Sequence, residues 1–190
     1  MIIWNHPTNY IEQYNNTVSE SDCERIINWY NKNPSKHSDY CEGKNSLDVW
    51  LEFHKRELPS IIIGQALEKC IEKYKKRYTF LNEKICFWKC ADGYNIQKYE
   101  EGEGYFSKHC EVDGPSYSMS RMLVWMLYLN NAKSGTRFYY PDLTQNKVVN
   151  AKRGRMVLWP AYWTHPHSGV TPNKGEKYIA TGWYTFEDNN

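Results

Sequence analysis

After residue 83 the sequence becomes a series of short apolar and aromatic runs, and this pattern constrains the fold more than any other feature. The runs are KICFWKC, YNIQKYE, MLVWMLYL, TRFYY, KVVN, RMVLWP and KYIATGWYTF. Turn-forming stretches such as ADG, EEGEG, NNAKSG and TPNKGE separate them. Short apolar runs between turn signals are typical of strands in an antiparallel sandwich, jelly roll or barrel. The sequence therefore predicts a dominant β core over about residues 83–187.

Two amphipathic helices are predicted before residue 83. The segment 19–32 opens with Ser and Asp cap candidates and then places apolar residues at helical spacing. The segment 59–78 starts at a proline and carries an apolar face opposite a basic one. We expect both helices to pack on one outer face of the β core. A chain of 190 residues has the size of one domain. We thus expect one α+β domain over 1–190, with its helical part over about 1–82.

Composition and sequence patterns indicate which partners and which compartment to expect. Lys and Arg number 24 against 22 Asp and Glu, and this net charge of +2 argues against a nucleic-acid partner. The N-terminus MIIWNHPTNY has no signal-peptide pattern, and the longest apolar run, LVWMLYL, is far shorter than a membrane helix. The six cysteines are scattered without a zinc-knuckle or disulfide spacing. We expect a cytoplasmic protein with reduced thiols and no membrane partner.

The stretch YFSKHCEVDG contains two candidate metal ligands. On a strand, residues two apart point to the same face, so His109 and Glu111 would present an imidazole and a carboxylate side by side. Asp113, on the same strand face, is an alternative ligand or a supporting residue. A second histidine from the stretch WTHPHSG, either His165 or His167, would complete a site of two histidines and one carboxylate. This ligand set is typical of non-haem Fe(II) oxygenases.

Residues 94 to 184 resemble the 2-oxoglutarate- and Fe(II)-dependent dioxygenases, specifically their prolyl-4-hydroxylase-like branch. The matching pieces, in chain order, are Tyr99, the turn EEGEG, His109-Cys110-Glu111, MLYLN, SGTRF, GRMVLWP, and the distal histidines with Lys177. The resemblance implies a double-stranded β-helix, or jelly roll, flanked by the N-terminal helices. Glu111 departs from the family pattern, because most members have aspartate there.

The resemblance also implies roles for individual residues. Fe(II) would be held by His109, Glu111 and one distal histidine, and 2-oxoglutarate would bind the iron as cosubstrate. In the family, the cation that pairs with the far carboxylate of 2-oxoglutarate lies ten residues after the distal histidine. Counting back from Lys177 therefore selects His167 over His165. Three more residues would contact the cosubstrate: Tyr99, Tyr128 and Thr136.

The activity implied by the resemblance is hydroxylation with O2, giving succinate and CO2, with ascorbate as a possible reductant. The branch suggests a prolyl residue in a peptide or protein as the substrate. A free amino acid, another small metabolite or a nucleobase is the alternative for the same chemistry. A non-catalytic β-sandwich binding module is the alternative from another class, and it would not depend on a metal site.

Overall fold

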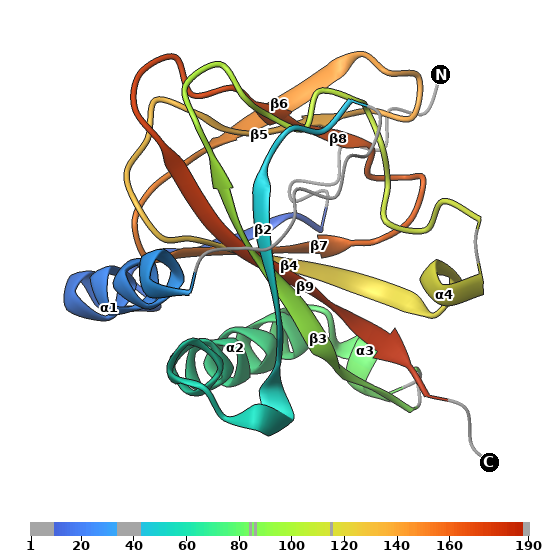
Figure 1. The fold of residues 1–190 in the computed structure, drawn as a ribbon. Coiled ribbons are helices and arrows are strands. Elements are labelled where there is room, and N and C mark those ends of the chain that lie inside the picture. The colour runs from blue at the N-terminus through green and yellow to red at the C-terminus, as the bar shows by residue number, and fades with distance from the viewer. Residues whose placement is uncertain (1–9, 34–42, 84, 86, 115, 188–190) are drawn as a thin grey trace.

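The computed structural model describes residues 10–33, 43–83, 85, 87–114 and 116–187, and these residues form three layers. A small β-sheet lies over one face of a large one, and two long helices, α1 (Glu20–Lys32) and α2 (Leu58–Arg77), lie under the other face (Figure 1). The predicted helices at 19–32 and 59–78 are therefore confirmed, as is their packing on one outer face of the sheet.

Every strand pair in both sheets is antiparallel. The large sheet has the order β1 (Glu12–Tyr14), β7 (Arg155–Pro160), β4 (Arg121–Tyr128), β9 (Lys177–Phe186), β3 (Trp88–Tyr99), β2 (Leu47–Glu52). The small sheet has the order β6 (Gln145–Asn150), β5 (Gly135–Tyr139), β8 (His167–Val170). Two antiparallel sheets that face one another, with helices outside, confirm the jelly-roll prediction.

Local sequence signals account for the ends of the long helices. The Ser19 hydroxyl accepts a hydrogen bond from the Asp22 amide at 3.1 Å, which caps the N-terminus of α1. Pro59 lies in the first turn of α2, where its missing N–H costs nothing, and basic residues occupy the last turn. The remaining helices are short: α3 (Thr79–Glu83), α4 (Ser116–Met119) and the 3-10 turn Phe53–Lys55.

Strand β4 separates two hydrophobic cores, and this explains its unbroken apolar sequence. Leu123, Trp125 and Leu127 pack toward the helices, whereas Val124 and Tyr128 pack between the two sheets. A strand covered on both faces must be apolar on both faces, because neither side chain series reaches water. Tyr99 and Ile179 belong to the core between the sheets and also line the cavity of the functional site.

The structure adds two strands that the sequence did not predict. Strands β1 and β2 lie in the N-terminal part and extend the large sheet at its two edges. Both have weak sequence signals, since β1 has three residues and β2 has polar residues among its apolar ones. The predicted turn ADG is also wrong, because β3 continues through it with a bulge between Cys90 and Tyr94.

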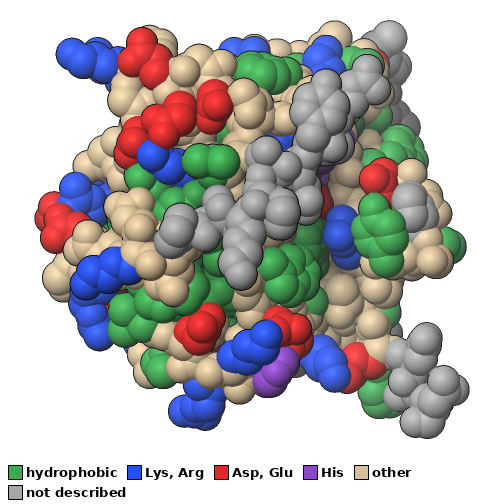
Figure 2. All heavy atoms as spheres, viewed as in Figure 1, with side chains coloured by type: hydrophobic (Ala, Val, Ile, Leu, Met, Phe, Trp, Pro, Cys, Tyr) green, Lys and Arg blue, Asp and Glu red, His purple; other side chains and the backbone are tan. Residues whose placement is uncertain are grey.

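Two expectations from composition concern the whole chain. Within the part of the chain that the structure describes, no helix is long and apolar enough to span a membrane, and the cytoplasmic location stays a prediction. The four cysteines in the described ranges are free thiols: Cys23, Cys70, Cys90 and Cys110. Cys41 and Cys86 lie outside the described residues. On the face shown in Figure 2, acidic and basic side chains are interspersed.

The helix layer offers a direct test of the packing. The side chain of Ile63 in α2 is 0% exposed, whereas Ile61, two residues earlier, is 43% exposed. We expect Ile63→Ala to lower the free energy of unfolding by about 2–5 kcal/mol, because it leaves a cavity under the sheet. Ile61→Ala should change it by less than about 0.5 kcal/mol. Urea unfolding measures both, and equal effects would contradict this packing.

Candidate functional site

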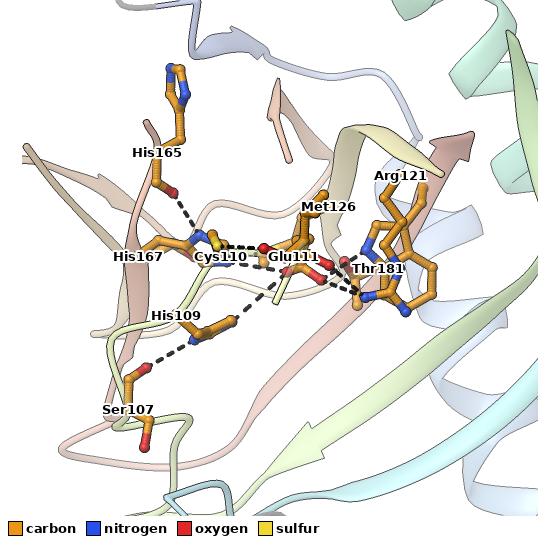
Figure 3. Close-up of polar contacts among 12 residues, drawn as sticks. Ser107, His109, Cys110, Glu111, Arg121, Met126, His165, His167 and Thr181 are labelled. Atoms are coloured by element: carbon orange, nitrogen blue, oxygen red, sulfur yellow. Dashed lines mark hydrogen bonds and ion pairs between the residues drawn. The ribbon is translucent and has the colours of Figure 1, made fainter. Parts of the chain in front are cut away.

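His109, Glu111 and His167 converge in the structure. One donor atom from each residue lies within 4.8 Å of the others. The Glu111 Oε1 atom is 3.3 Å from His167 Nε2 and 3.8 Å from His109 Nε2 (Figure 3). A metal ion about 2.1 Å from each donor requires donor pairs no more than about 4.2 Å apart, and both measured pairs meet this limit.

A main-chain bridge brings the two histidines together. The amide of His109 donates to the His167 carbonyl at 3.0 Å, and the amide of His167 donates to the His109 carbonyl at 2.8 Å. Residues that exchange both hydrogen bonds across an antiparallel pair place their side chains on the same face. The imidazole centroids are accordingly 4.3 Å apart. The predicted strand at 109–111 is not a regular strand, and this bridge takes its place.

The hydrogen bonds of the histidines leave their Nε2 atoms free to bind a metal. His109 Nδ1 donates to the Ser107 carbonyl at 2.9 Å, and His167 Nδ1 donates to the His165 carbonyl at 3.1 Å. Because a carbonyl only accepts, each Nδ1 carries a proton, and in the neutral form of either ring the lone pair therefore lies on Nε2. Burial, followed by the nearby charge of His167, lowers the pKa of His109 to about 4.

Glu111 presents a carboxylate to these two lone pairs. Burial by itself raises the pKa of Glu111, but the contacts with His167, His109 and Trp183 outweigh it and hold the pKa at about 2. The carboxylate is therefore ionised, and when both rings are neutral three acceptor atoms face one another in a partly buried space. Such an arrangement repels itself unless a cation lies between the atoms, and the set of two imidazoles and one carboxylate suits Fe(II).

The other two candidate ligands lie outside this cluster. The ring of His165 points away from Glu111 (Figure 3), and its Nδ1 atom lies 2.8 Å from the Thr164 hydroxyl. Only the carbonyl of His165 contributes, as the acceptor for His167. Asp113 lies at the edge of the adjoining cavity with an exposed side chain. The geometry thus brings together the set with His167 and Glu111.

A cavity of about 250 Å³ adjoins the cluster and contains Lys177. The Lys177 side chain is 3% exposed, with its Nζ atom 3.4 Å from the Val170 carbonyl and 4.3 Å from the centre of the Tyr99 ring. No carboxylate of the described residues lies within ion-pair distance of it. Burial alone lowers the pKa of Lys177 to about 8. A buried ammonium without an anion fits a site for an acidic ligand.

Two of the other predicted cosubstrate contacts line the same cavity. Thr136 and Tyr99 both reach it, and so do Ile179, Thr181 and Trp183 on the Lys177 side of strand β9. Alternate residues of that strand share one face, and this face lines the cavity. Tyr128 lies behind this wall, fully buried, with its hydroxyl 2.7 Å from the Thr136 hydroxyl. Tyr128 does not line the cavity itself, but its hydroxyl contacts Thr136, which does.

The hydroxyl of Tyr99 is turned into the protein. It donates to Gln97 Oε1 at 2.9 Å, and Gln97 Nε2 donates to Asp48 Oδ2 at 2.9 Å. A carboxylate only accepts, so the amide nitrogen of Gln97 must face Asp48 and its oxygen must face Tyr99. What Tyr99 presents to the Lys177 ammonium is the face of its ring, a cation–π contact.

Sequence reasoning did not place two residues that contact Glu111. The Trp183 indole donates to Glu111 Oε2 at 2.8 Å, and the Arg121 guanidinium donates to the Glu111 carbonyl at 3.0 Å. No sequence spacing relates Trp183 to Glu111. Arg121 was one arginine among several in the β half. Only the pairing of strands β4 and β9 brings the two residues together.

The burial of Lys177 leads to a stability prediction. Because the pKa in the folded state, about 8, is below the usual 10.5, the protonated side chain penalises folding at pH 7. This penalty fades as the pH rises from about 8 to above 10.5. We therefore expect Lys177→Met to raise the free energy of unfolding by about 2–3 kcal/mol at pH 7 and by less near pH 10.

Urea unfolding at the two pH values measures this effect. Lys174→Met is the matched control, because Lys174 is exposed in the preceding turn. A Lys177→Met variant with the same stability as wild type at neutral pH would contradict the burial of an unpaired ammonium.

Comparison with known proteins agrees with this geometry. The sequence model of the 2OG-Fe(II) oxygenase superfamily matches residues 94–185, which contain all three clustered ligands and Lys177. Enzymes of this superfamily use Fe(II), 2-oxoglutarate and O2. No curated protein sequence matches the chain. The family match gives no support to the alternative of a non-catalytic binding module.

Solved structures of prolyl hydroxylases share the fold. A viral collagen prolyl hydroxylase from Paramecium Bursaria Chlorella virus-1 has a TM-score of 0.65 at 22% identity, covering 92% of this chain and 95% of that one. A Pseudomonas putida prolyl-4-hydroxylase has a TM-score of 0.69 at 13% identity, covering 96% and 95%. A Trichoplax adhaerens prolyl hydroxylase, in complex with a hypoxia inducible factor peptide fragment, has a TM-score of 0.67 at 19% identity, covering 94% and 84%. The chain therefore carries a 2OG-Fe(II) oxygenase domain, on a fold that it shares with prolyl hydroxylases.

Proposed function

We propose that this enzyme hydroxylates a prolyl residue in a peptide or protein, with Fe(II) held by His109, Glu111 and His167. The observation that carries the proposal is the pairing of two features in one cavity. Three lone pairs converge where a metal ion would lie, and Lys177 is buried without an anion where a dicarboxylate would end. The first feature suits Fe(II), and the second suits 2-oxoglutarate.

When bound, the iron and 2-oxoglutarate supply the oxidising chemistry, in which O2 is consumed, succinate and CO2 are released and the substrate gains a hydroxyl group. The protein residues bind and orient. The carbonyls of Ser107 and His165 hold the two imidazoles in the tautomer that binds a metal. Lys177 pairs with the far carboxylate of 2-oxoglutarate, and the Thr136 hydroxyl, held by Tyr128, offers it a hydrogen bond.

The proposal places Tyr99 against Lys177 rather than against the cosubstrate. Its ring face holds the ammonium in place, while its proton is committed to Gln97. An ammonium fixed in this way loses less side-chain entropy when the carboxylate binds. Tyr99 therefore acts as a positioning residue for Lys177.

A peptide substrate is supported by the shape and composition of the cavity wall. Tyr105, Tyr117 and Trp183 line the cavity, and Tyr117 is 69% exposed at its edge. Aromatic surfaces suit prolyl rings in extended peptides. The neighbouring structures include prolyl hydroxylases, one of them with a bound peptide fragment. The alternative is the same chemistry on a free amino acid or another small metabolite. A nucleobase is less favoured, because acidic and basic side chains are interspersed on the face shown in Figure 2.

The ligand assignment predicts opposite results for two neighbouring histidines. We expect His167→Ala to abolish measurable Mn(II) binding, because it removes a donor atom from the cluster. His165→Ala should bind Mn(II) within about threefold of wild type, since only the carbonyl of His165 supports the site. Anaerobic calorimetry measures both affinities. Loss of binding in His165→Ala with retention in His167→Ala would reverse the assignment.

The proposed reaction is tested by its products. With Fe(II), 2-oxoglutarate and proline-containing peptides, we expect succinate and a peptide heavier by one oxygen atom, with the mass gain on proline. The assay should be run with and without ascorbate, because the role of ascorbate as a reductant is still a prediction. Lys177→Met should lose the activity by weakening 2-oxoglutarate binding, and Lys174→Met should keep it. A hydroxylated free amino acid or metabolite, with unmodified peptides, would favour the alternative substrate.

A further inference from the structure

A glutamate at the carboxylate position creates a problem of orientation. Glutamate has one more rotatable bond than aspartate, and either of its two oxygens can turn toward a metal. The segment that carries Glu111 is irregular: the His109–His167 bridge holds its start, but at Glu111 itself the main chain is held by the hydrogen bond from its amide to the Ala161 carbonyl at 2.9 Å rather than by a strand ladder. Something else must therefore fix the carboxylate.

Two side chains fix the outer oxygen of Glu111. The Trp183 Nε1 atom donates to Oε2 at 2.8 Å, and the indole N–H has no other role than donor. The Arg121 guanidinium lies 3.5 Å from the same Oε2 atom and donates to the Glu111 carbonyl at 3.0 Å. It therefore holds both ends of the residue. Arg121 lies on the side of Glu111 opposite the two histidines (Figure 3).

Arg121 and Trp183 also hold one another. The guanidinium lies 3.8 Å from the centre of the Trp183 ring, which is a close cation–π contact. Arg121 opens strand β4 and Trp183 lies on strand β9, and these two strands pair in the middle of the large sheet. The support for Glu111 thus comes from two paired strands in the middle of the large sheet, whereas Glu111 itself lies on a loop.

We propose that the Arg121–Trp183 pair positions Glu111 so that Oε1 alone faces the histidines as the metal-binding oxygen. Oε1 is the atom at 3.3 and 3.8 Å from the two Nε2 atoms, while Oε2 is occupied by the indole and the guanidinium. By binding Oε2, the pair restricts the additional rotatable bond that glutamate has relative to aspartate. This inference rests on the proposed function, because it requires a metal at His109, Glu111 and His167.

A double-mutant cycle tests the pairing between the indole and the longer side chain. Four proteins are compared: wild type, Trp183→Phe, Glu111→Asp and the double variant. Trp183→Phe keeps an aromatic side chain but replaces the indole by a smaller ring without an N–H donor. We expect it to weaken Mn(II) binding about tenfold in the glutamate protein. In the aspartate protein it should change binding by less than about twofold, because a carboxylate one methylene shorter is withdrawn from the indole.

The readouts are Mn(II) affinity by anaerobic calorimetry and the Mn(II) electron paramagnetic resonance line shape, which reports on the symmetry of the ligands. Trp163→Phe is the matched control, because Trp163 is 67% exposed and has no contact with Glu111. Melting temperatures without metal show whether each variant is folded. Arg121→Met is the second variant if Trp183→Phe does not fold, and the same dependence on Glu111 is expected.

The outcomes separate this inference from the function on which it rests. Wild-type protein that binds no Mn(II) would overturn the proposed metal site. Wild-type protein that binds Mn(II), with equal effects of Trp183→Phe in the glutamate and aspartate proteins, would leave the metal site intact and overturn the role of the pair. A large effect confined to the glutamate protein supports it.

Discussion

The two main-chain hydrogen bonds between His109 and His167 are the interaction on which the site depends. They tie an irregular segment to strand β8 and set both imidazoles on one face. Glu111 then follows two residues after His109 and reaches the same point. Because carbonyls hold both Nδ1 protons, the lone pairs that remain can only face inward. Backbone pairing therefore determines the chemistry of the side chains at this site.

Lys177 shows that the site is built for binding rather than for stability. Its ammonium is buried against a ring face and a carbonyl, without a carboxylate among the described residues in contact with it. Glu111 differs, because its Oε2 atom accepts from the Trp183 indole at 2.8 Å and lies 3.5 Å from the Arg121 guanidinium. An uncompensated charge next to a compensated one is expected where a ligand supplies the missing partner. The Lys177 end of the cavity thus requires an anionic group from a ligand, whereas the Glu111 end requires a cation.

Much of the fold follows from local patterns. The run MLVWMLYL predicted a strand, and the helix signals at Ser19 and Pro59 were read correctly because caps act within one turn. Strands β1 and β2 escaped prediction because they are stabilised by partners far away in the sequence rather than by their own composition. The bulge at Gly93 was not predicted either, because it also depends on a neighbouring strand. A side chain there would collide with the Trp50 ring of the neighbouring strand, which no local pattern shows.

The sequence by itself determined the kind of site: His109, Glu111, a distal histidine and Lys177 appear in an order and spacing that mark an Fe(II) and 2-oxoglutarate enzyme. From the residues alone, His165 and His167 were equal candidates, and the resemblance favoured the second. Only the tertiary structure turned one ring into the cluster and the other away, because one residue pairs with His109 and the other does not. The hydrogen-bond direction at Tyr99 and the support of Glu111 by Arg121 and Trp183 were also decided there, since each depends on strands that meet only in the folded chain.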